Sequence, residues 1–105
     1  MAIQINTTIK TDEGFEINEI WAWLDQYLVS SNWANVKYYK SKADFQEGNK
    51  ALNISSLPAN IQTDLTNADF WADNLAETFH EKCIAAIEAV TGPNTCTIDK
   101  TDPFA

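Results

Sequence analysis

His80 is the only histidine of the chain, and it lies three residues after Glu77. This Glu-x-x-His spacing occurs on helices in carboxylate metal sites, but such sites need further ligands from neighbouring helices, and only one long helix is predicted here. General-base catalysis by His80 would need a nucleophile, and no Ser or Cys stands in a recognisable nucleophile motif. We therefore interpret His80 as a residue at the border of an apolar helix face, and we expect no catalytic residue, no metal and no cofactor.

The other reactive or phosphate-binding residue types are few. Cys83 and Cys96 are too few for a disulfide framework and lack metal-finger spacing, so we expect a buried thiol at Cys83. The glycines are Gly14, Gly48 and Gly92, each accounted for by a turn or a helix end. A glycine-rich phosphate loop is therefore absent from the sequence, and we expect no small-molecule substrate.

The charge balance favours a protein partner. The chain contains fifteen acidic residues and seven basic ones, all of them Lys, which gives a net charge of −8. Nucleic-acid binding needs a dense cationic surface and is not expected. No apolar run reaches the roughly 20 residues of a membrane span, and the first residues do not resemble a signal peptide. We expect a soluble product made in a cytoplasm, with no membrane partner.

The first half of the chain has the pattern of an antiparallel meander. Residues 3–10 alternate apolar and polar side chains, and the turn residues 11–14 follow. Residues 15–29 are ambiguous: we predict a strand from their Trp, Tyr, Ile and Val, and a helix over 17–28 is the alternative. After a turn, residues 33–39 are predicted to return as a third strand.

A single helical turn is predicted directly after the third strand. Ser41 can cap a turn over residues 42–47, with Phe45 as its anchor. Gly48 is expected to end the turn with positive φ. Ala51 and Leu52 then lead the chain back to the core.

The passage from Thr7 to Leu52 resembles a group of small structural proteins of tailed bacteriophages. In that group a hairpin is followed by a strand, a lysine or serine turn, an aromatic, a glycine, a lysine and a small-Leu or Pro-Leu pair. Here Asn49 follows the glycine, and Ala51 stands where Pro is frequent in the group. The resemblance implies a strand for residues 15–29. It also implies a virion protein of the tail, neck or baseplate region, made in the host bacterial cytoplasm, that self-associates and docks to other virion proteins.

A long helix is predicted over residues 66–92. Thr66 and Asp69 have capping-box spacing, and Gly92-Pro93 closes the helix. Its expected apolar face comprises Ala72, Leu75, Ala76, Phe79, Cys83, Ala86, Ile87 and Val90.

Two less regular segments flank this helix. Residues 53–65 are predicted to form an ordered loop with a short helical turn, because their apolar side chains need a surface to cover. The tail, residues 93–105, is predicted to add an edge strand over 95–99 and then fray. The fold class is therefore α+β in one domain: an antiparallel sheet of three to four strands, a meander over 1–52, packed by one long C-terminal helix.

The aromatic residues suggest an interface. In a strand over 15–29, Trp21, Trp23 and Tyr27 point to one face, while Ile20, Ala22, Leu24 and Leu28 point to the other. One helix covers only one face, so the second face is either covered by the loop 53–65 or docks to another subunit or virion protein. We favour docking, because Trp and Tyr often anchor interfaces. The predicted interface residues are Trp21, Trp23, Tyr27, Trp33 and Tyr39.

A different class of function stays open. The acidic composition also fits a binding or inhibitor protein directed at a host partner, which would imitate a polyanion. Such a protein needs its carboxylates clustered on one exposed surface. A virion subunit needs an apolar docking surface instead.

Overall fold

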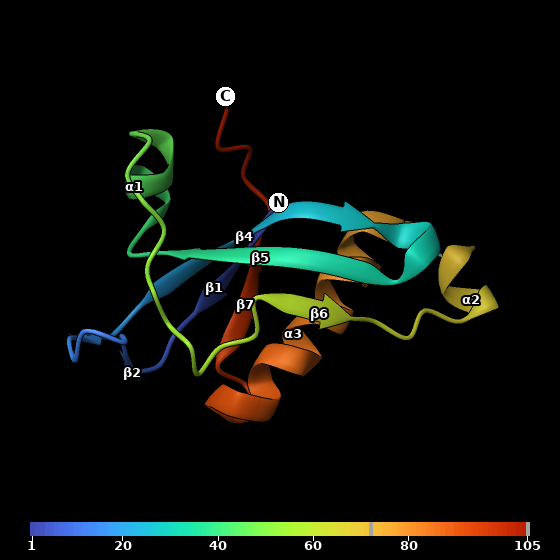
Figure 1. The fold of residues 1–105 in the computed structure, drawn as a ribbon. Helices are drawn as coiled ribbons and strands as arrows, with labels where there is room; N and C mark the ends of the chain where they lie inside the picture. Colours follow the sequence, from blue (N-terminus) through green and yellow to red (C-terminus); the bar gives the residue numbers. More distant parts are fainter. Residues whose placement is uncertain (72, 105) are drawn as a thin grey trace.

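The computed structural model describes residues 1–71 and 73–104, without the side chain of Val29. A five-stranded antiparallel sheet runs in the order β6-β5-β4-β1-β7, and the long helix α3 packs on it (Figure 1). The strands are β1 (Ala2–Ile5), β4 (Ile20–Leu28), β5 (Trp33–Tyr39), β6 (Asn60–Gln62) and β7 (Cys96–Asp99). The helices are α1 (Lys42–Gln46), α2 (Asn67–Phe70) and α3 (Leu75–Thr91), with a 3-10 turn, η1 (Val29–Ser31), between β4 and β5. The α+β class is confirmed, and the sheet is larger than the three to four strands predicted.

The predicted first strand is divided between two sheets. Only β1 joins the large sheet, whereas β2 (Ile9–Lys10) pairs with β3 (Glu16–Ile17) as a separate small hairpin. The predicted turn between them is confirmed. Gly14 has φ of +95°, and the Phe15 amide donates to Thr11 Oγ1.

Strand β4 confirms the strand prediction for the ambiguous segment, so the alternative helix over 17–28 is wrong. It pairs with β5 from Trp21 to Leu28, with a bulge between Leu24 and Gln26. A bulge adds one residue to one strand and so reverses the alternation of side chains beyond it. Tyr27 therefore shares the α3 face with its cross-strand partner Ala34, and Leu28 lies with Trp33 on the opposite face. Both Tyr27 and Leu28 were predicted on the wrong face.

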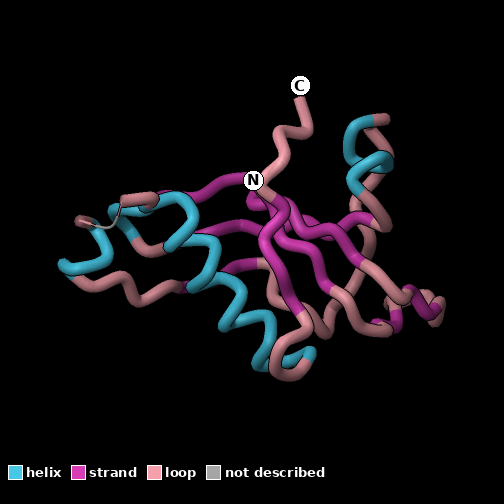
Figure 2. Tube along the Cα trace, turned by 180° about the vertical axis from the view of Figure 1, so that it is seen from behind, coloured by secondary structure: helices cyan, strands magenta, loops and turns pink. Residues whose placement is uncertain are grey.

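The predicted single turn after β5 is confirmed as α1. The Asp44 amide donates to Ser41 Oγ at 3.2 Å, and Gly48 ends the turn with φ of +77°. The Leu52 amide then donates to the Tyr38 carbonyl and returns the chain to the sheet. Figures 1 and 2 both place α1 and the C-terminal tail on the side of the sheet opposite α3.

The two segments predicted as irregular each contribute an edge strand. The segment 53–65 contains β6, which pairs with β5 and buries Ile61. Before β6 the segment makes a single turn, in which the Leu57 amide donates to the Ile54 carbonyl at 3.2 Å. Strand β7 pairs with β1 at the other edge, as predicted for residues 95–99. Each edge strand is short, which limits uncontrolled association through free backbone groups.

The predicted helix over 66–92 is two helices. The capping box of Thr66 and Asp69 is present, but it begins the short α2. Asn74 has extended backbone angles, and its side chain accepts from the Glu77 amide at 3.0 Å, so α3 begins with its own cap. Ala72, predicted on the apolar face, lies outside the described residues. Val90 is exposed, although the pattern placed it on the buried face.

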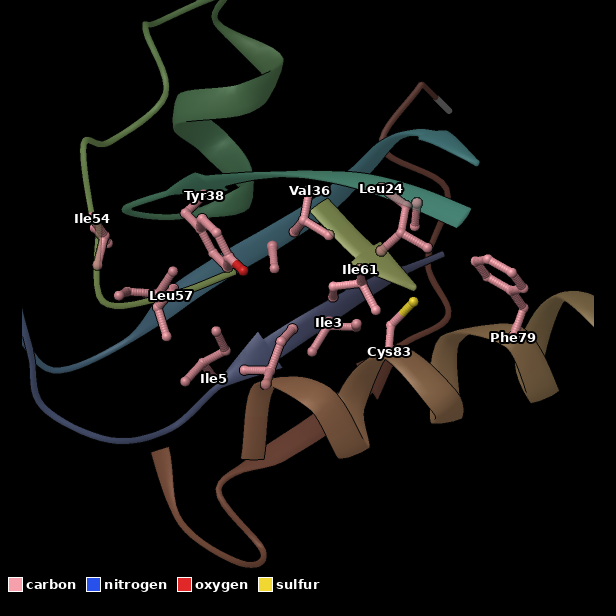
Figure 3. Packing of buried hydrophobic residues seen from close by; sticks show 14 residues of the cluster. Ile3, Ile5, Leu24, Val36, Tyr38, Ile54, Leu57, Ile61, Phe79 and Cys83 are labelled. Carbon is pink, nitrogen blue, oxygen red and sulfur yellow. The ribbon is translucent and has the colours of Figure 1, made fainter. Parts of the chain in front are cut away.

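The main core lies between α3 and the sheet (Figure 3). Phe79, Cys83 and Ile87 form the buried centre of the α3 face at four-residue spacing. The segment 53–65 adds Ile54, Leu57 and Ile61 to this same core, so it covers the α3 side of the sheet. Its apolar residues do not reach the second face, where the alternative to docking had placed them.

Removing either large side chain at the centre of α3 should destabilise the fold. Phe79→Ala and Ile87→Ala each leave a cavity, and we expect a loss of about 2 to 5 kcal/mol in the free energy of unfolding. Glu81→Ala, on the exposed face of the same helix, is the matched control and should change little. Urea unfolding measures all three, and equal midpoints would contradict this packing.

Gly48 should be sensitive to substitution for a purely conformational reason. A Cβ built at Gly48 meets no atom within 4 Å, so Gly48→Ala introduces no clash. The positive φ alone should cost about 1 kcal/mol of stability, and Gly48→Asn should cost less because Asn tolerates this region. Thermal unfolding of the two variants checks the order; an Asn variant that is less stable than Ala would refute it.

Candidate functional site

An aromatic cluster covers one end of the second sheet face. It consists of Trp21 and Trp23 from β4, Tyr39 from β5, Phe45 from α1 and Phe104 from the tail. The two Trp rings stack with centroids 5.6 Å apart, and Phe45 lies 5.1 Å from Trp21 and 4.9 Å from Trp23. Trp21 and Tyr39 are buried, and Trp23 is half-buried. The helix α1 therefore acts as the cover for this face.

The C-terminal tail closes the same cluster. Trp21 Nε1 donates to Asp99 Oδ2 at 3.0 Å, and Gln46 Nε2 donates to the Pro103 carbonyl at 2.9 Å. Phe104 then lies edge-on to Trp23 with a centroid distance of 5.7 Å. The expectation that the tail frays is wrong for these described residues. The expectation that one helix leaves this face bare is also wrong at this end of the sheet.

The predicted interface residues therefore fall into two groups. The structure brings Trp21, Trp23 and Tyr39 together in the aromatic cluster. Tyr27 is exposed but lies on the α3 face, where its ring stacks on Phe79 at 5.3 Å. Trp33 is half-buried at the far end of β5, beside Leu28 and Gln62 of the neighbouring strands.

The elements at the end of the molecule where α2 lies (Figure 1) carry several exposed apolar side chains, namely Tyr27, Leu28, Phe70 and Trp71. The segment leading to α2 is tied to the β4–β5 turn, because the Thr63 and Leu65 amides donate to the carbonyl and side-chain oxygens of Asn32. Both views place α2 at the same end as this turn (Figures 1 and 2). Trp71 is 87% exposed there. We call this end of the molecule the α2 end; its exposed apolar residues are Tyr27, Leu28, Phe70 and Trp71, and the half-buried Trp33 lies opposite Leu28.

Phe70 and Trp71 were not identified from the sequence as surface residues. The signal was their helical phase: counted at ~100° per residue from Ile87, both fall outside the apolar face of a helix over 66–92. Two adjacent aromatics off the buried face already indicate exposure.

His80 is buried in the core instead of lying at the border of the helix face. It is 2% exposed, and its Nδ1 lies 2.7 Å from the Ala76 carbonyl of its own helix. No partner lies within hydrogen-bond distance of Nε2 among the described residues. Burial lowers the pKa of His80, so the ring is neutral at neutral pH. Glu77 pairs with Lys100 at 3.0 Å, so both members of the Glu-x-x-His pair have structural partners.

The thiols are in environments that favour the protonated form. Burial raises the pKa of Cys83 to about 12 and also raises the pKa of Cys96. A thiol held in this form is a poor nucleophile and a poor metal ligand. Both cysteines are free, as expected, and Cys83 is buried. Within residues 1–71 and 73–104, no group of three or more His, Cys, Asp or Glu side chains is placed to hold a metal ion.

Two hollows flank the segment 51–53 where it crosses between the β2–β3 hairpin and the sheet. Their volumes are about 580 and 520 Å³. Asp12 lines the first and accepts from the Ser55 amide and hydroxyl at 2.8 and 2.6 Å, which lowers the pKa of Asp12. These bonds fasten the hairpin to residues 53–55. Asp12 therefore has a structural role in this arrangement.

The carboxylates are distributed over several elements. Lys37 pairs with Asp25 on the β4–β5 ribbon, Lys82 of α3 approaches Asp64 and Asp69, and Lys100 pairs with Glu77. Hydrogen bonds from Thr101 and Trp21 hold the pKa of Asp99 at about 2.

In the described part of the chain, none of the helices meets the length and hydropathy needed to cross a bilayer.

Acid should destabilise the fold in the range where His80 titrates. Below about pH 6.5 the unfolded state binds a proton at His80, whereas burial keeps the ring neutral in the folded state. The free energy of unfolding is therefore highest above that pH and decreases as the pH drops below it. We expect the urea concentration at the unfolding midpoint to be lower at pH 5.5 than at pH 7.5. His80→Phe should flatten this dependence, because Asp12 and Asp99 titrate only below about pH 4. If the urea midpoint of His80→Phe depended on pH as steeply as that of the wild type, His80 would not be the group responsible.

Comparison of the chain with protein-family models, with curated proteins and with solved structures finds no match.

Proposed function

We propose that this chain is a non-enzymatic structural protein of a tailed bacteriophage virion, in the tail, neck or baseplate region. It acts by associating with itself and docking to other virion proteins. The observation that carries the proposal is the α2 end, where Trp71 is 87% exposed and Tyr27, Leu28 and Phe70 are exposed at the same end of the molecule. The resemblance of residues 7–52 to small phage structural proteins supports the location in a particle.

The α2 end has the composition of a binding surface. Trp and Tyr are enriched at the centres of interfaces, where a few large side chains provide most of the binding energy. Leu28 and Trp33 extend the surface onto the sheet, because they are opposite each other in the β4–β5 pair. Large exposed apolar areas are uncommon on monomers, which supports a partner at this end.

The residue types that usually perform catalysis serve the fold in this chain. His80 is buried with its Nδ1 bonded within α3, and Cys83 is buried as a thiol. Catalysis would require one of these side chains to reach a substrate. Their placement supports a structural function over an enzymatic one.

The same chemistry supports protein partners over nucleic acid. The net charge is −8, and the seven cations are Lys, of which three form ion pairs with carboxylates. A phosphate backbone would be repelled by this surface. These ion pairs also neutralise the charge of several carboxylates, which weakens the alternative of an acidic inhibitor that imitates a polyanion.

Replacing Trp71 with Ser should disrupt assembly without unfolding the chain. Loss of an interface Trp costs about 2 kcal/mol or more, so we expect self-association to weaken by roughly 30-fold or more in sedimentation experiments. Phe15→Ser is the matched control, because Phe15 is 70% exposed in the hairpin turn, at the opposite end of the molecule (Figure 1).

The particle itself provides the decisive measurement. Virions are purified from phage whose genomes encode the wild type, Phe15→Ser or Trp71→Ser. Mass spectrometry of these particles should detect the wild-type and Phe15→Ser chains, and little of the Trp71→Ser chain. Circular dichroism should show the same helix content in all three. Absence of the wild-type chain from virions would exclude the proposed location, and a wild-type chain that stays monomeric at all concentrations would exclude self-association.

A further inference from the structure

The charged residues around α2 are almost all acidic. Residues 51–81 contain carboxylates but no Lys and no Arg. Asp69 lies in α2, and Asp64 and Asp73 lie in the segments on either side of it. The turn 29–32 between β4 and β5, at the same end of the molecule (Figures 1 and 2), has no charged residue. The exposed apolar side chains of the α2 end are therefore accompanied by carboxylates.

Only part of this negative charge is neutralised within the chain. Lys82 Nζ of α3 lies 3.8 Å from both Asp64 Oδ1 and Asp69 Oδ2. The side chain of Asp64 is 91% exposed, and an exposed pair at this distance is weak. Asp73 is exposed, and among the described residues no cation lies within 4.0 Å of its carboxylate. Asp64 and Asp73 can therefore interact with the charges of a partner.

Trp71 adds a second preference for positive charge. Its side chain is 87% exposed, and the face of an indole ring attracts Lys and Arg more strongly than the ring of Tyr or Phe does. Asp73 follows Trp71 by two residues, so a cation drawn to the ring also enters the field of this carboxylate. Ring and carboxylate therefore favour the same kind of partner group.

We propose that the α2 end docks to a partner protein whose surface combines apolar side chains with Lys or Arg. This partner chemistry rests on the proposed function, namely its docking to other virion proteins. Two α2 ends placed against each other bring like charges together, so a second copy fits this end less well. Salt should therefore weaken docking to the partner and strengthen self-association through the α2 end.

Two short helical peptides serve as probes of this preference. One is made of Leu and Lys, and in the other each Lys is replaced by Glu; anisotropy of a fluorescent label on the peptide gives the Kd. We expect the wild type to bind the Lys peptide at least about tenfold more tightly than the Glu peptide. Raising NaCl from about 0.05 to 0.5 M should weaken binding of the Lys peptide by about tenfold. Equal binding of the two peptides, or no binding of the Lys peptide, would overturn the inference.

Matched double variants locate the charges that matter. Asp64→Asn with Asp73→Asn removes two charges at the α2 end. Glu16→Gln with Glu19→Gln is the control, because both side chains are exposed and lie at the hairpin end of the molecule, opposite α2 (Figure 1). The two double variants have the same net charge, and circular dichroism should show the same helix content in both.

The Lys peptide should distinguish these variants. We expect its Kd to rise by about fivefold or more in the α2-end variant and by less than about twofold in the control. Trp71→Ser should weaken its binding by about tenfold or more. Equal changes in the two double variants would mean that net charge alone is recognised, and wild-type binding by Trp71→Ser would mean that the peptide binds elsewhere; either result overturns the inference.

Purified virions separate this inference from the proposed function. If virions contain the wild-type chain and little of Trp71→Ser, but the peptides show no preference for charge at the α2 end, the cationic partner is overturned and docking through Trp71 stands. If the peptide results are as expected but virions lack the wild-type chain, the preference of the α2 end stands and its partner is not a virion protein.

Discussion

Strand β4 carries apolar side chains on both faces, and the rest of the structure depends on covering them. Ile20, Ala22 and Leu24 lie in the main core, while Trp21 and Trp23 lie on the opposite face. A strand at the centre of a sheet with two apolar faces needs a layer on each side. The helix α3 covers one face, and α1 with the C-terminal tail covers part of the other (Figure 2). This unequal cover leaves apolar residues exposed at the α2 end.

The bulge in β4 determines which side chains remain at that end. The extra residue between Leu24 and Gln26 turns Tyr27 toward α3, where it stacks on Phe79. The same shift turns Leu28 toward the face of Trp21 and Trp23, at the end of that face which α1 does not cover. Because side chains alternate with a period of two, one inserted residue changes the partner of every later side chain. The docking surface proposed here is a consequence of this local irregularity.

The polar groups of the chain mainly connect elements that are distant in sequence. Asp99 joins β7 to Trp21, Asp12 joins the hairpin to Ser55, and Asn32 joins the β4–β5 turn to the segment before α2. A small domain buries a limited apolar area, so such connections matter for order in its outer segments. The C-terminal tail illustrates this, since the Gln46–Pro103 hydrogen bond and the contact of Phe104 with Trp23 hold it on the aromatic cluster.

Much of the fold was determined by local patterns in the sequence. The turn at residues 11–14, the cap at Ser41, the positive φ of Gly48 and the edge strand near residue 96 were all predicted, because each depends on the chemistry of a few neighbouring residues. The buried face of α3 was largely predicted too, since it follows from helical periodicity. For the candidate site, the sequence identified the aromatic residues of β4 and β5 but not their exposure.

Tertiary structure alone decided the remaining features. A strand at β6 is stable only because β5 offers a free edge, and the break before α3 depends on the Asn74 cap competing with helix continuation. Trp21 is buried because the distant segments α1 and the C-terminal tail cover it, whereas Trp71 is exposed because none of the described segments covers it. No local pattern contains that information, because contacts between residues 78 positions apart, such as Trp21 and Asp99, are set by how the whole chain closes.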